Sequence, residues 1–249
     1  MAMTTHDGAT PVMLITGGSG GIGRALAARL RQQGCTVIVA ARDADRLHAA
    51  AAELDVEPVQ VDVTVAAEVD ALVAGVLARH GRIDGVAHCV GSILLKPLHL
   101  TSDDDWARTL LLNLTSAFHV MRAVVARHRA PLSIALVSSS AAGIGLPNHE
   151  AIAAAKAGIE GLVRSSAATY AGRGVRVNAV APGLVRTPLA ARITGSEAAL
   201  KTSLALHPIG RIGEPDDVAA VLAHLLDPAS SWITGQVIGV DGGMSRVRA

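Results

Sequence analysis

The residues best suited to chemistry lie in two stretches, a glycine-rich run at residues 16–23 and an alanine-rich run around Lys156. The first reads TGGSGGIG and joins a short apolar run to a helical pattern. In such a turn Gly17 permits the tight bend, Gly21 lets the backbone approach a pyrophosphate, and Gly23 lets helix and strand pack closely. The helix N-terminus that follows offers N–H groups and a partial positive charge to phosphates. The spacing therefore predicts a dinucleotide-binding turn.

The second stretch, HEAIAAAKAG at residues 149–158, places Lys156 one helical turn after Ile152. Residues four apart share one face of a helix, so the two side chains are neighbours. Isoleucine has no polar atom that an ammonium group could assist. The charge of Lys156 can still meet the hydroxyl groups of a bound ligand, and we therefore interpret this lysine first as a ligand-binding residue.

Short Val- and Ile-rich runs alternate with longer helical patterns, which indicates repeated βαβ units around a parallel sheet. Strands are expected over 12–17, 35–42, 57–63, 83–91, 132–140, 174–183 and within 232–243, and helices over 21–34, 43–53, 66–81, 103–128 and 150–171. The predicted fold is α/β, a Rossmann-type doubly wound parallel sheet of about seven strands with helices on both faces. No linker divides the chain, so residues 1–249 are expected to form a single NAD(P)-binding domain. The irregular segment 184–213 is predicted to be a substrate lid.

Composition excludes several kinds of partner. Half of the residues are hydrophobic, 17% are charged and the net charge is +1, so no basic nucleic-acid surface is expected. No apolar run approaches the roughly 18 residues that a membrane span needs. The N-terminus lacks the features of a signal peptide, and two cysteines are too few for a disulfide framework, which together predict a cytoplasmic protein. His88 and Cys89 alone do not make a metal site. We expect them to be a buried, hydrogen-bonded histidine and a packed thiol.

The end of the second predicted strand bears on which dinucleotide is bound. The stretch AARD puts Ala41 where a site for NAD often has an acidic residue, and Arg42 follows it. A guanidinium can grip the oxygens of a 2′-phosphate in pairs. This favours NADP over NAD, although Arg42 could also be a solvated charge at the start of a helix.

Nearly the whole chain resembles the short-chain dehydrogenase/reductase family. TGGSGGIG resembles the family's cofactor loop, and LVSSSAAG, NAVAPGLVRTP and TGQVIGVDGG resemble its later motifs in the right order. The resemblance implies hydride transfer between a nicotinamide and a small carbonyl or alcohol substrate, in a homotetramer or homodimer. It implies catalytic roles for Ser139, Lys156 and Asn113. The cofactor-binding positions it implies are Gly17, Ser19, Gly21, Ile22, Gly23, Arg42, Asp62, Val63, Gly91, Lys156, Pro182, Gly183, Val185 and Thr187.

Two departures from the family pattern bear on the mechanism. His88, Cys89 and Val90 precede Gly91 where the family has Asn-Asn-Ala, and Ile152 stands where the family's catalytic tyrosine belongs. General acid catalysis contributes typically 10²–10⁴-fold, so the loss of the tyrosine matters. We expect an NADP-dependent oxidoreductase with a non-standard proton donor. The alternative is a catalytically impaired NADP-binding protein, either a redox sensor or a silent partner subunit.

Six replacements for the missing donor stay open: His149, Glu150, Ser139, Ser140, Lys156 itself, or a water relayed from Asn113. His149 and Glu150 also have simpler interpretations, as a loop or cap residue and as a first-turn acid. Tyr170 is excluded, because 14 residues along a helix correspond to roughly 21 Å.

Overall fold

The computed structural model describes residues 3–5, 7–128 and 131–247, and its strands form one sheet in the order β3-β2-β1-β4-β5-β6-β7. The strands are β1 (Val12–Thr16), β2 (Thr36–Ala41), β3 (Glu57–Gln60), β4 (Gly85–His88), β5 (Leu132–Val137), β6 (Val175–Pro182) and β7 (Val237–Val240). Every neighbouring pair is parallel, so the carboxyl ends of all seven strands meet at one edge. The order reverses between β1 and β4, which is where doubly wound sheets bind ligands.

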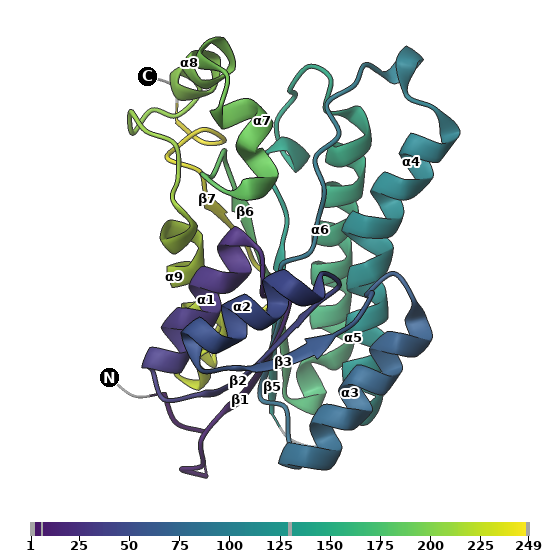
Figure 1. Cartoon of the computed structure of the whole chain (residues 1–249), viewed down its shortest axis with the longest axis vertical. Helices are drawn as coiled ribbons and strands as arrows, with labels where there is room; N and C mark the ends of the chain where they lie inside the picture. Colours follow the sequence, from purple (N-terminus) through teal and green to yellow (C-terminus); the bar gives the residue numbers. More distant parts are fainter. Residues whose placement is uncertain (1–2, 6, 129–130, 248–249) are drawn as a thin grey trace.

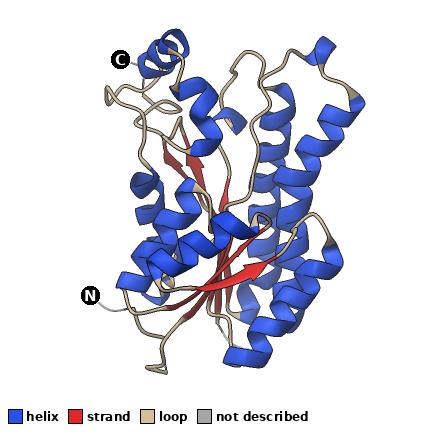
Figure 2. Cartoon of the chain, viewed as in Figure 1, coloured by secondary structure: helices blue, strands red, loops and turns tan. Residues whose placement is uncertain are grey.

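Helices cover both faces of this sheet (Figures 1 and 2). One face carries α1 (Gly21–Gln32), α2 (Ala44–Leu54) and α9 (Pro215–Leu226), and the other carries α3 (Ala66–His80), α5 (Ser116–Arg127) and α6 (Glu150–Tyr170). Three shorter helices, α4 (Asp103–Leu110), α7 (Ala191–Thr194) and α8 (Glu197–Ala205), lie towards the upper end of the molecule in Figure 1. The predicted Rossmann-type fold is confirmed.

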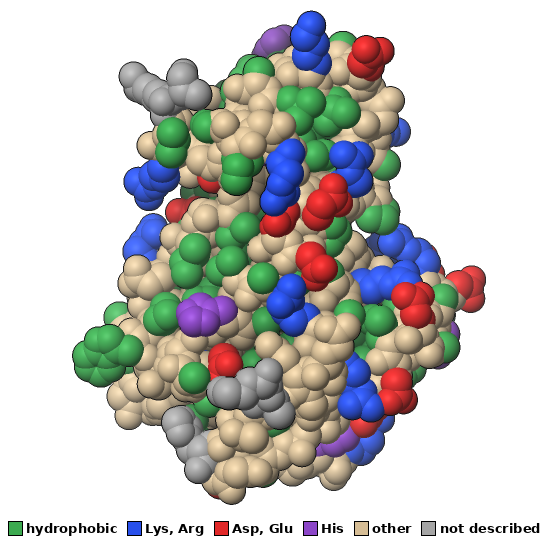
Figure 3. Space-filling model, turned by 90° about the vertical axis from the view of Figure 1, so that its left-hand side faces the viewer, with side chains coloured by type: hydrophobic (Ala, Val, Ile, Leu, Met, Phe, Trp, Pro, Cys, Tyr) green, Lys and Arg blue, Asp and Glu red, His purple; other side chains and the backbone are tan. Residues whose placement is uncertain are grey.

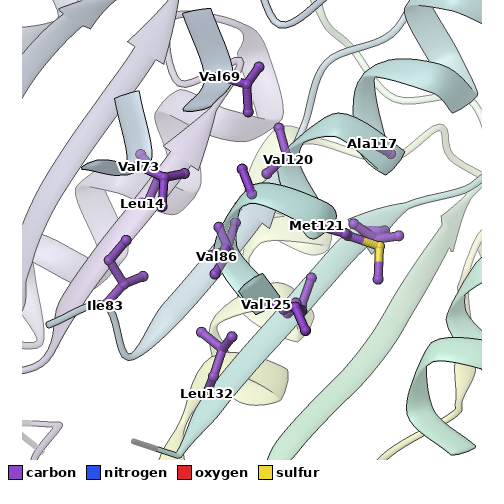
Figure 4. Packing of buried hydrophobic residues seen from close by; sticks show 14 of the residues in the cluster. Leu14, Val69, Val73, Ile83, Val86, Ala117, Val120, Met121, Val125 and Leu132 are labelled. Carbon is purple, nitrogen blue, oxygen red and sulfur yellow. The ribbon is translucent and has the colours of Figure 1, made fainter. Parts of the chain in front are cut away.

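The two faces of the sheet have separate hydrophobic cores, because successive strand residues point to opposite sides. Leu14 belongs to the core beneath α3, α5 and α6, whereas the next residue, Ile15, belongs to the core beneath α1, α2 and α9. Figure 4 shows the first core, with Val73 of α3 and Val120 of α5 packed over Leu14 and Val86 of the sheet. Each such side chain stabilises the fold by about 1.5–3 kcal/mol when fully buried.

The structure differs from the sequence expectations in three elements. The expected helix over 103–128 is interrupted by a π-helical turn at Leu111–Thr115, between α4 and α5. The segment 184–213, expected to be irregular, contains α7 and α8, and α9 was not predicted. The apolar face of α9 packs on α1 and the sheet, but its pattern follows a long loop and was not recognised as a separate helix.

The continuous helical segment Asp103–Arg127 is long and apolar enough to cross a membrane by length and composition, which the sequence analysis did not anticipate. Half of its most apolar window is buried inside the protein, and it packs against α3 and α6. Three aspartates also occupy its first turn. These contacts identify it as a core helix of the sheet face that also carries α3 and α6.

Candidate active site

The carboxyl edge of the sheet brings the predicted site residues into one row. Seven of them follow closely on the ends of six neighbouring strands, which all run in the same direction. In the order of the sheet they are Asp62 and Val63 after β3, Arg42 after β2, Gly17 after β1, Gly91 after β4, Ser139 after β5, and Gly183 after β6.

The turn after β1 can only be built from glycine at two of its positions. Gly17 has φ +77°, and a Cβ there would lie 2.8 Å from the carbonyl carbon of Cys89. A Cβ on Gly23 would lie 2.3 Å from the carbonyl oxygen of Gly17. No side chain of the described residues caps the N-terminus of α1, and no acid lies in its first turn. This open helix end, with Ser19 and Ile22 half-buried beside it, fits a dinucleotide diphosphate.

Arg42 and Asp62 come together at the outer end of the row. The Arg42 side chain is 75% exposed, and its Nη1 lies 3.8 Å from Oδ2 of Asp62. Oδ1 of Asp62 accepts hydrogen bonds from the backbone N–H and the hydroxyl of Thr64, which hold the pKa of the carboxyl below its usual value. Val63 is buried, and its carbonyl accepts a bond from His119 of α5. A partly paired, exposed guanidinium therefore stands beside a fixed carboxylate.

Lys156 is the centre of the site. Its side chain is buried, and Nζ donates a 2.8 Å hydrogen bond to the carbonyl oxygen of Val137, the last residue of β5. Burial lowers the pKa of Lys156 to about 8, against a small opposing effect of Cys89. A Cβ on Gly91 would lie 3.4 Å from Nζ and 2.9 Å from Oδ1 of Asn113, so these three residues meet at one point. No carboxylate among the described residues forms an ion pair with Lys156.

Asn113 lies in the π-helical turn and is fully buried. Its Oδ1 accepts the backbone N–H of Ser92 at 3.0 Å. Its Nδ2 donates to the hydroxyl of Ser92 at 2.9 Å and to the carbonyl of Thr109 at 3.0 Å. These bonds fix the amide in one orientation, with Oδ1 towards Gly91. Single π turns within α-helices are frequent at functional sites.

Of the three serines after β5, two are engaged in structural bonds. Ser138 donates to the Glu160 carboxylate or the Lys156 carbonyl, and Ser140 donates to the Asp241 carboxylate at 2.8 Å. Ser139 accepts a bond from the backbone N–H of Ala141. Its hydroxyl donates to no acceptor in the described part of the chain, so Ser139 alone of the three keeps a free donor.

Ile152 lies on α6 one turn before Lys156, is 6% exposed, and belongs to neither of the two main cores. Two of the open donors, His149 and Glu150, and the excluded Tyr170 lie at the ends of this helix. Nδ1 of His149 donates to the carbonyl of Pro147, and Glu150 is exposed. Tyr170 packs on the core at the far end of α6, under Arg173, which confirms its exclusion. The wall beside Lys156 is therefore apolar.

His88 is a buried, hydrogen-bonded residue, as expected. The hydroxyl of Thr16 donates to Nδ1 of His88 at 2.8 Å, and Nε2 of His88 lies 3.1 Å from the hydroxyl of Ser116. Because Ser116 donates its own proton to the carbonyl of Leu112, Nε2 of His88 carries the imidazole proton. Burial, with a smaller contribution from Lys156, lowers the pKa of His88 to about 3. This chain ties the glycine turn to the π turn that holds Asn113, a link that sequence reasoning missed.

Cys89 is likewise a packed thiol. It is half-buried, and its backbone lies against Gly17. Burial raises the pKa of Cys89 to about 12, so the thiol is neutral. In the described residues, no three or more His, Cys, Asp or Glu side chains come together as metal ligands.

The segment after β6 returns over the glycine turn. A Cβ on Gly21 would lie 2.7 Å from Cγ2 of Thr187, which shows how closely the two segments approach. Pro182 ends β6, and Val185 is buried and forms a parallel bridge with Gly213. The predicted residues Gly21 and Thr187 are thus neighbours.

His207, which the sequence analysis did not single out, lies two residues after the end of α8 and anchors this segment. It is buried, its Nδ1 donates to the carbonyl of Ser203 at 2.6 Å, and its Nε2 accepts the N–H of Leu184 at 3.1 Å. A Cβ on Gly183 would lie only 2.5 Å from Nε2 of His207. A glycine is therefore required at position 183 for His207 to bond this segment.

A cavity of about 610 Å³ lies at the opposite, amino edge of the sheet. Arg82, Asp84, Arg176 and the 98% exposed Trp232 are among its lining residues. It contains none of the residues predicted for the site. The face of the molecule seen in Figure 3 carries both basic and acidic side chains and shows no continuous basic patch.

This arrangement defines a dinucleotide-binding α/β protein, and comparisons with known proteins identify its family. Residues 17–245 match a family model described as "Enoyl-(Acyl carrier protein) reductase". The chain is 36% identical over 240 residues to the 3-oxoacyl-[acyl-carrier-protein] reductase of Thermotoga maritima, covering 94% of this chain and 97% of that protein. It is 36% identical to the cis-4-hydroxycyclohexanecarboxylate dehydrogenase of Sinomonas cyclohexanicum, with 95% and 97% covered.

Solved structures give the same result. A short-chain dehydrogenase/reductase from Mycobacterium ulcerans superposes with a TM-score of 0.92 at 33% identity, covering 100% of this chain and 93% of that one. The actinorhodin polyketide ketoreductase with NADPH superposes with a TM-score of 0.90 at 30% identity, covering 98% and 100%. The chain belongs to the short-chain dehydrogenase/reductase family. It is an NAD(P)-dependent oxidoreductase that acts on alcohol and carbonyl groups.

Proposed function

We propose that this chain is an NADP(H)-dependent reductase of a small carbonyl compound that works without the tyrosine acid of its family. The observation that carries the proposal is that Lys156, Asn113 and Gly91 lie together at the carboxyl edge of the sheet. Lys156 bonds the last residue of β5, and Ser139, whose hydroxyl has no acceptor among the described residues, follows that strand. Ile152 stands one turn before Lys156, where the family's motif has tyrosine. We assign the whole range 1–249 to one domain with a lid at 184–213; residues 1–2 and 248–249 lie outside the described part.

In the proposed site, bound reduced nicotinamide supplies the hydride. The backbone of Gly17, Ser19, Gly21, Ile22 and Gly23 would hold the diphosphate, since the open N-terminus of α1 favours an anion. Asp62, Val63, Gly91, Pro182, Gly183, Val185 and Thr187 would line the remaining length of the dinucleotide. Lys156 would bind ribose hydroxyls and keep a positive charge at the reacting end, and Ser139 would donate a hydrogen bond to the substrate oxygen.

The preference for NADP rests on Arg42. Among the described residues, its exposed guanidinium forms one ion pair, at 3.8 Å to Asp62, which leaves donors for a 2′-phosphate. Replacing Arg42 with leucine should weaken NADPH binding roughly 10–100-fold, the effect of one charge-assisted hydrogen bond of about 1.5–3 kcal/mol, and leave NADH binding unchanged. Calorimetric titration measures both affinities. Equal affinity of the wild type for NADPH and NADH would overturn the preference.

Activity is tested by screening the purified protein with NADPH against ketones, enones, quinones and imines. Ser139→Ala should lower kcat by at least about 100-fold on the best substrate, the size of a lost donor to a developing oxyanion. NADPH affinity should stay the same, because Ser139 is placed against the substrate. Absence of turnover in every class, with NADPH bound, would reject the proposal.

That negative result would support the alternative, a nucleotide-binding protein without its own activity. The specific observation behind it is again Ile152, which offers no proton. If this alternative holds, Ile152→Tyr creates activity where the wild type has none, with little change in NADPH affinity.

We further propose that the chain forms a homodimer or homotetramer through α4–α6. Leu111 and Phe118, seven residues apart on one helical face, are 39% and 43% exposed. On α6, nothing lies within 4 Å of a Cβ built on Gly161, which leaves room for close approach of a second helix. Phe118→Glu should shift the sedimentation equilibrium towards monomer. A monomeric wild type would refute the proposal.

A further inference from the structure

The segment between β6 and α9 has one buried side chain along most of its length. Between residues 191 and 211, every residue except His207 is exposed or half-buried, and neither α7 nor α8 has a buried residue. In Figure 1 these two helices stand above the carboxyl ends of β6 and β7. A segment with so little apolar packing opens more easily than a core element does. Polar contacts, rather than a core of its own, must therefore fix its position.

Both ring nitrogens of His207 take part in such contacts. Nδ1 donates to the carbonyl oxygen of Ser203 in α8 at 2.6 Å, and Nε2 accepts the backbone N–H of Leu184 at 3.1 Å. A nitrogen that accepts a hydrogen bond carries no proton, so these two bonds select the neutral ring with its proton on Nδ1. The ring thereby joins α8 to the second residue after β6.

The His207 side chain is confined on its other side by the turn after β7. A Cβ built on Gly242 would lie 3.7 Å from Cβ of His207, and a Cβ built on Gly183 would lie 3.2 Å from Cα of Asp241. The Asp241 carboxylate in turn accepts a 2.8 Å hydrogen bond from the hydroxyl of Ser140. His207 therefore lies between the first residues after β6 and the turn that holds Ser140.

The residues that follow Leu184 reach back to the glycine turn. Val185 is buried and forms a parallel bridge with Gly213. Thr187 comes so close to Gly21 that a Cβ there would lie 2.7 Å from Cγ2 of Thr187. Three residues of chain span at most about 11 Å, so a displacement of Leu184 is passed on to Thr187.

The strand order tells which half of a dinucleotide this segment meets. Arg42, the proposed partner of the 2′-phosphate, follows β2, and the glycine turn that would hold the diphosphate follows β1. Gly183 and Leu184 follow β6, which lies three strands from β1 on the side away from β2. A dinucleotide that extends across the glycine turn therefore presents its nicotinamide half to this segment, on the side where Lys156 and Ser139 lie.

We propose that His207 is a positioning residue for the nicotinamide half of the cofactor, because its Nε2 fixes the backbone from Leu184 to Thr187 beside the nicotinamide ring. The inference rests on the proposed function and adds to it a residue that acts through the backbone of the lid. Without the imidazole, the N–H of Leu184 and the carbonyl of Ser203 lose these partners, and residues 191–211 keep no buried side chain. The adenine half lies on the other side of the glycine turn and should bind as before.

The test compares NADPH with 2′-phospho-ADP-ribose, which lacks only the nicotinamide ring, by calorimetric titration. His207→Leu should weaken NADPH binding about 10-fold, which corresponds to about 1.4 kcal/mol, and change binding of 2′-phospho-ADP-ribose by less than about twofold. His207→Gln should keep NADPH affinity within about threefold of wild type, because an amide oxygen can accept the N–H of Leu184. His80→Leu is the matched control and should change neither affinity, since His80 bonds Glu57 at the amino edge of the sheet.

Gly183→Ala tests the same contact with the histidine present. Its Cβ would lie 2.5 Å from Nε2 of His207, so the same selective loss of NADPH affinity is expected. At saturating NADPH, His207→Leu should also lower kcat on the best substrate by about 10–100-fold with a smaller change in KM, because a misplacement of about 1 Å can cost about 100-fold in rate.

The outcomes separate the inference from the proposed function. Equal weakening of both ligands by His207→Leu or by Gly183→Ala, or unchanged NADPH affinity in both variants, would overturn the inference and leave the proposed function standing. A His207→Gln protein that binds NADPH as weakly as His207→Leu would do the same. A wild type that binds neither ligand would overturn the proposed function as well.

Discussion

Replacing Lys156 with methionine should make the cofactor-free protein more stable while it weakens cofactor binding. The ammonium is buried with one carbonyl partner and no carboxylate, so the folded chain bears the cost of a desolvated charge. Methionine keeps the length of the side chain and removes the charge. The residue would then be one whose contribution to function opposes its contribution to stability.

The magnitude follows from the pKa of Lys156. Burial lowers it from 10.5 to about 8, and one unit corresponds to about 1.4 kcal/mol, so the charge destabilises the folded state by about 3 kcal/mol at pH 7. Loss of the bond to Val137 subtracts about 1 kcal/mol, which leaves a net gain of about 2 kcal/mol. Because the folded pKa lies below the unfolded one, the penalty is complete below pH 8 and disappears as the pH rises to 10.5. At pH 9.5 about 1 kcal/mol of it remains, so the advantage of methionine is then near zero.

Urea unfolding of wild type and Lys156→Met, without cofactor and at one protein concentration, measures this difference at pH 7 and pH 9.5. Comparing the two proteins at each pH cancels the ionisation of Cys35 and of the thiols in the unfolded chain. Cys89, whose pKa burial raises to about 12, stays neutral in the folded protein at both pH values. Lys201→Met removes an exposed lysine and should change stability by less than about 0.5 kcal/mol. A variant that is less stable than wild type at both pH values would refute the reasoning, since the charge would then not be a cost.

Three further predictions concern neighbours of this site. His88→Asn should be less stable than wild type at pH 7, and urea unfolding should show this difference shrink by about 2 kcal/mol at pH 5. The pKa of His88 is lowered to about 3 in the folded protein, so at pH 5 only the unfolded wild type takes up a proton on this residue, and the wild type loses stability. An unchanged difference would show that His88 is not buried as the neutral base. Gly23→Ala should lower stability by about 1–3 kcal/mol and abolish detectable NADPH binding, since its Cβ would lie 2.3 Å from the Gly17 oxygen; a variant that binds NADPH normally would contradict the turn geometry. Calorimetric affinity for NADPH in wild type should fall as the pH rises through 8, where Lys156 loses its proton, and Lys156→Met should show no such fall.

The sheet could be predicted from the sequence because every strand carries its own apolar run and the connections are helical. The strands are apolar on both faces of the sheet, since successive residues such as Leu14 and Ile15 belong to opposite cores. The glycine turn could also be predicted, since its spacing follows from steric contacts between Gly17 and Gly23. What failed were elements whose stability comes from tertiary packing. α9 follows a loop with prolines and glycines, and its apolar face packs on α1 and on strands β4 to β7. The short helices α7 and α8 have no fully buried residues, so no apolar stripe marks them in the sequence.

Within the site, sequence motifs identified the residues but not their contacts. Nothing in the pattern indicates that Ser138 and Ser140 are bonded to carboxylates and that Ser139 is free. The link from Thr16 through His88 to Ser116 joins residues about 72 and 28 positions apart, and only the fold brings them together. The π turn that orients Asn113 was likewise invisible, because its residues keep a helical apolar pattern.

The most direct test of the account is to follow the hydride itself. NADPH carrying two deuterium atoms at C4 of the nicotinamide, incubated with the protein and the best substrate of the screen, should give a product with one deuterium on the reduced carbon, detected by mass spectrometry and NMR. A reduced product without deuterium from the cofactor, or a protein that binds NADPH and transfers deuterium to no carbonyl compound, would contradict the account.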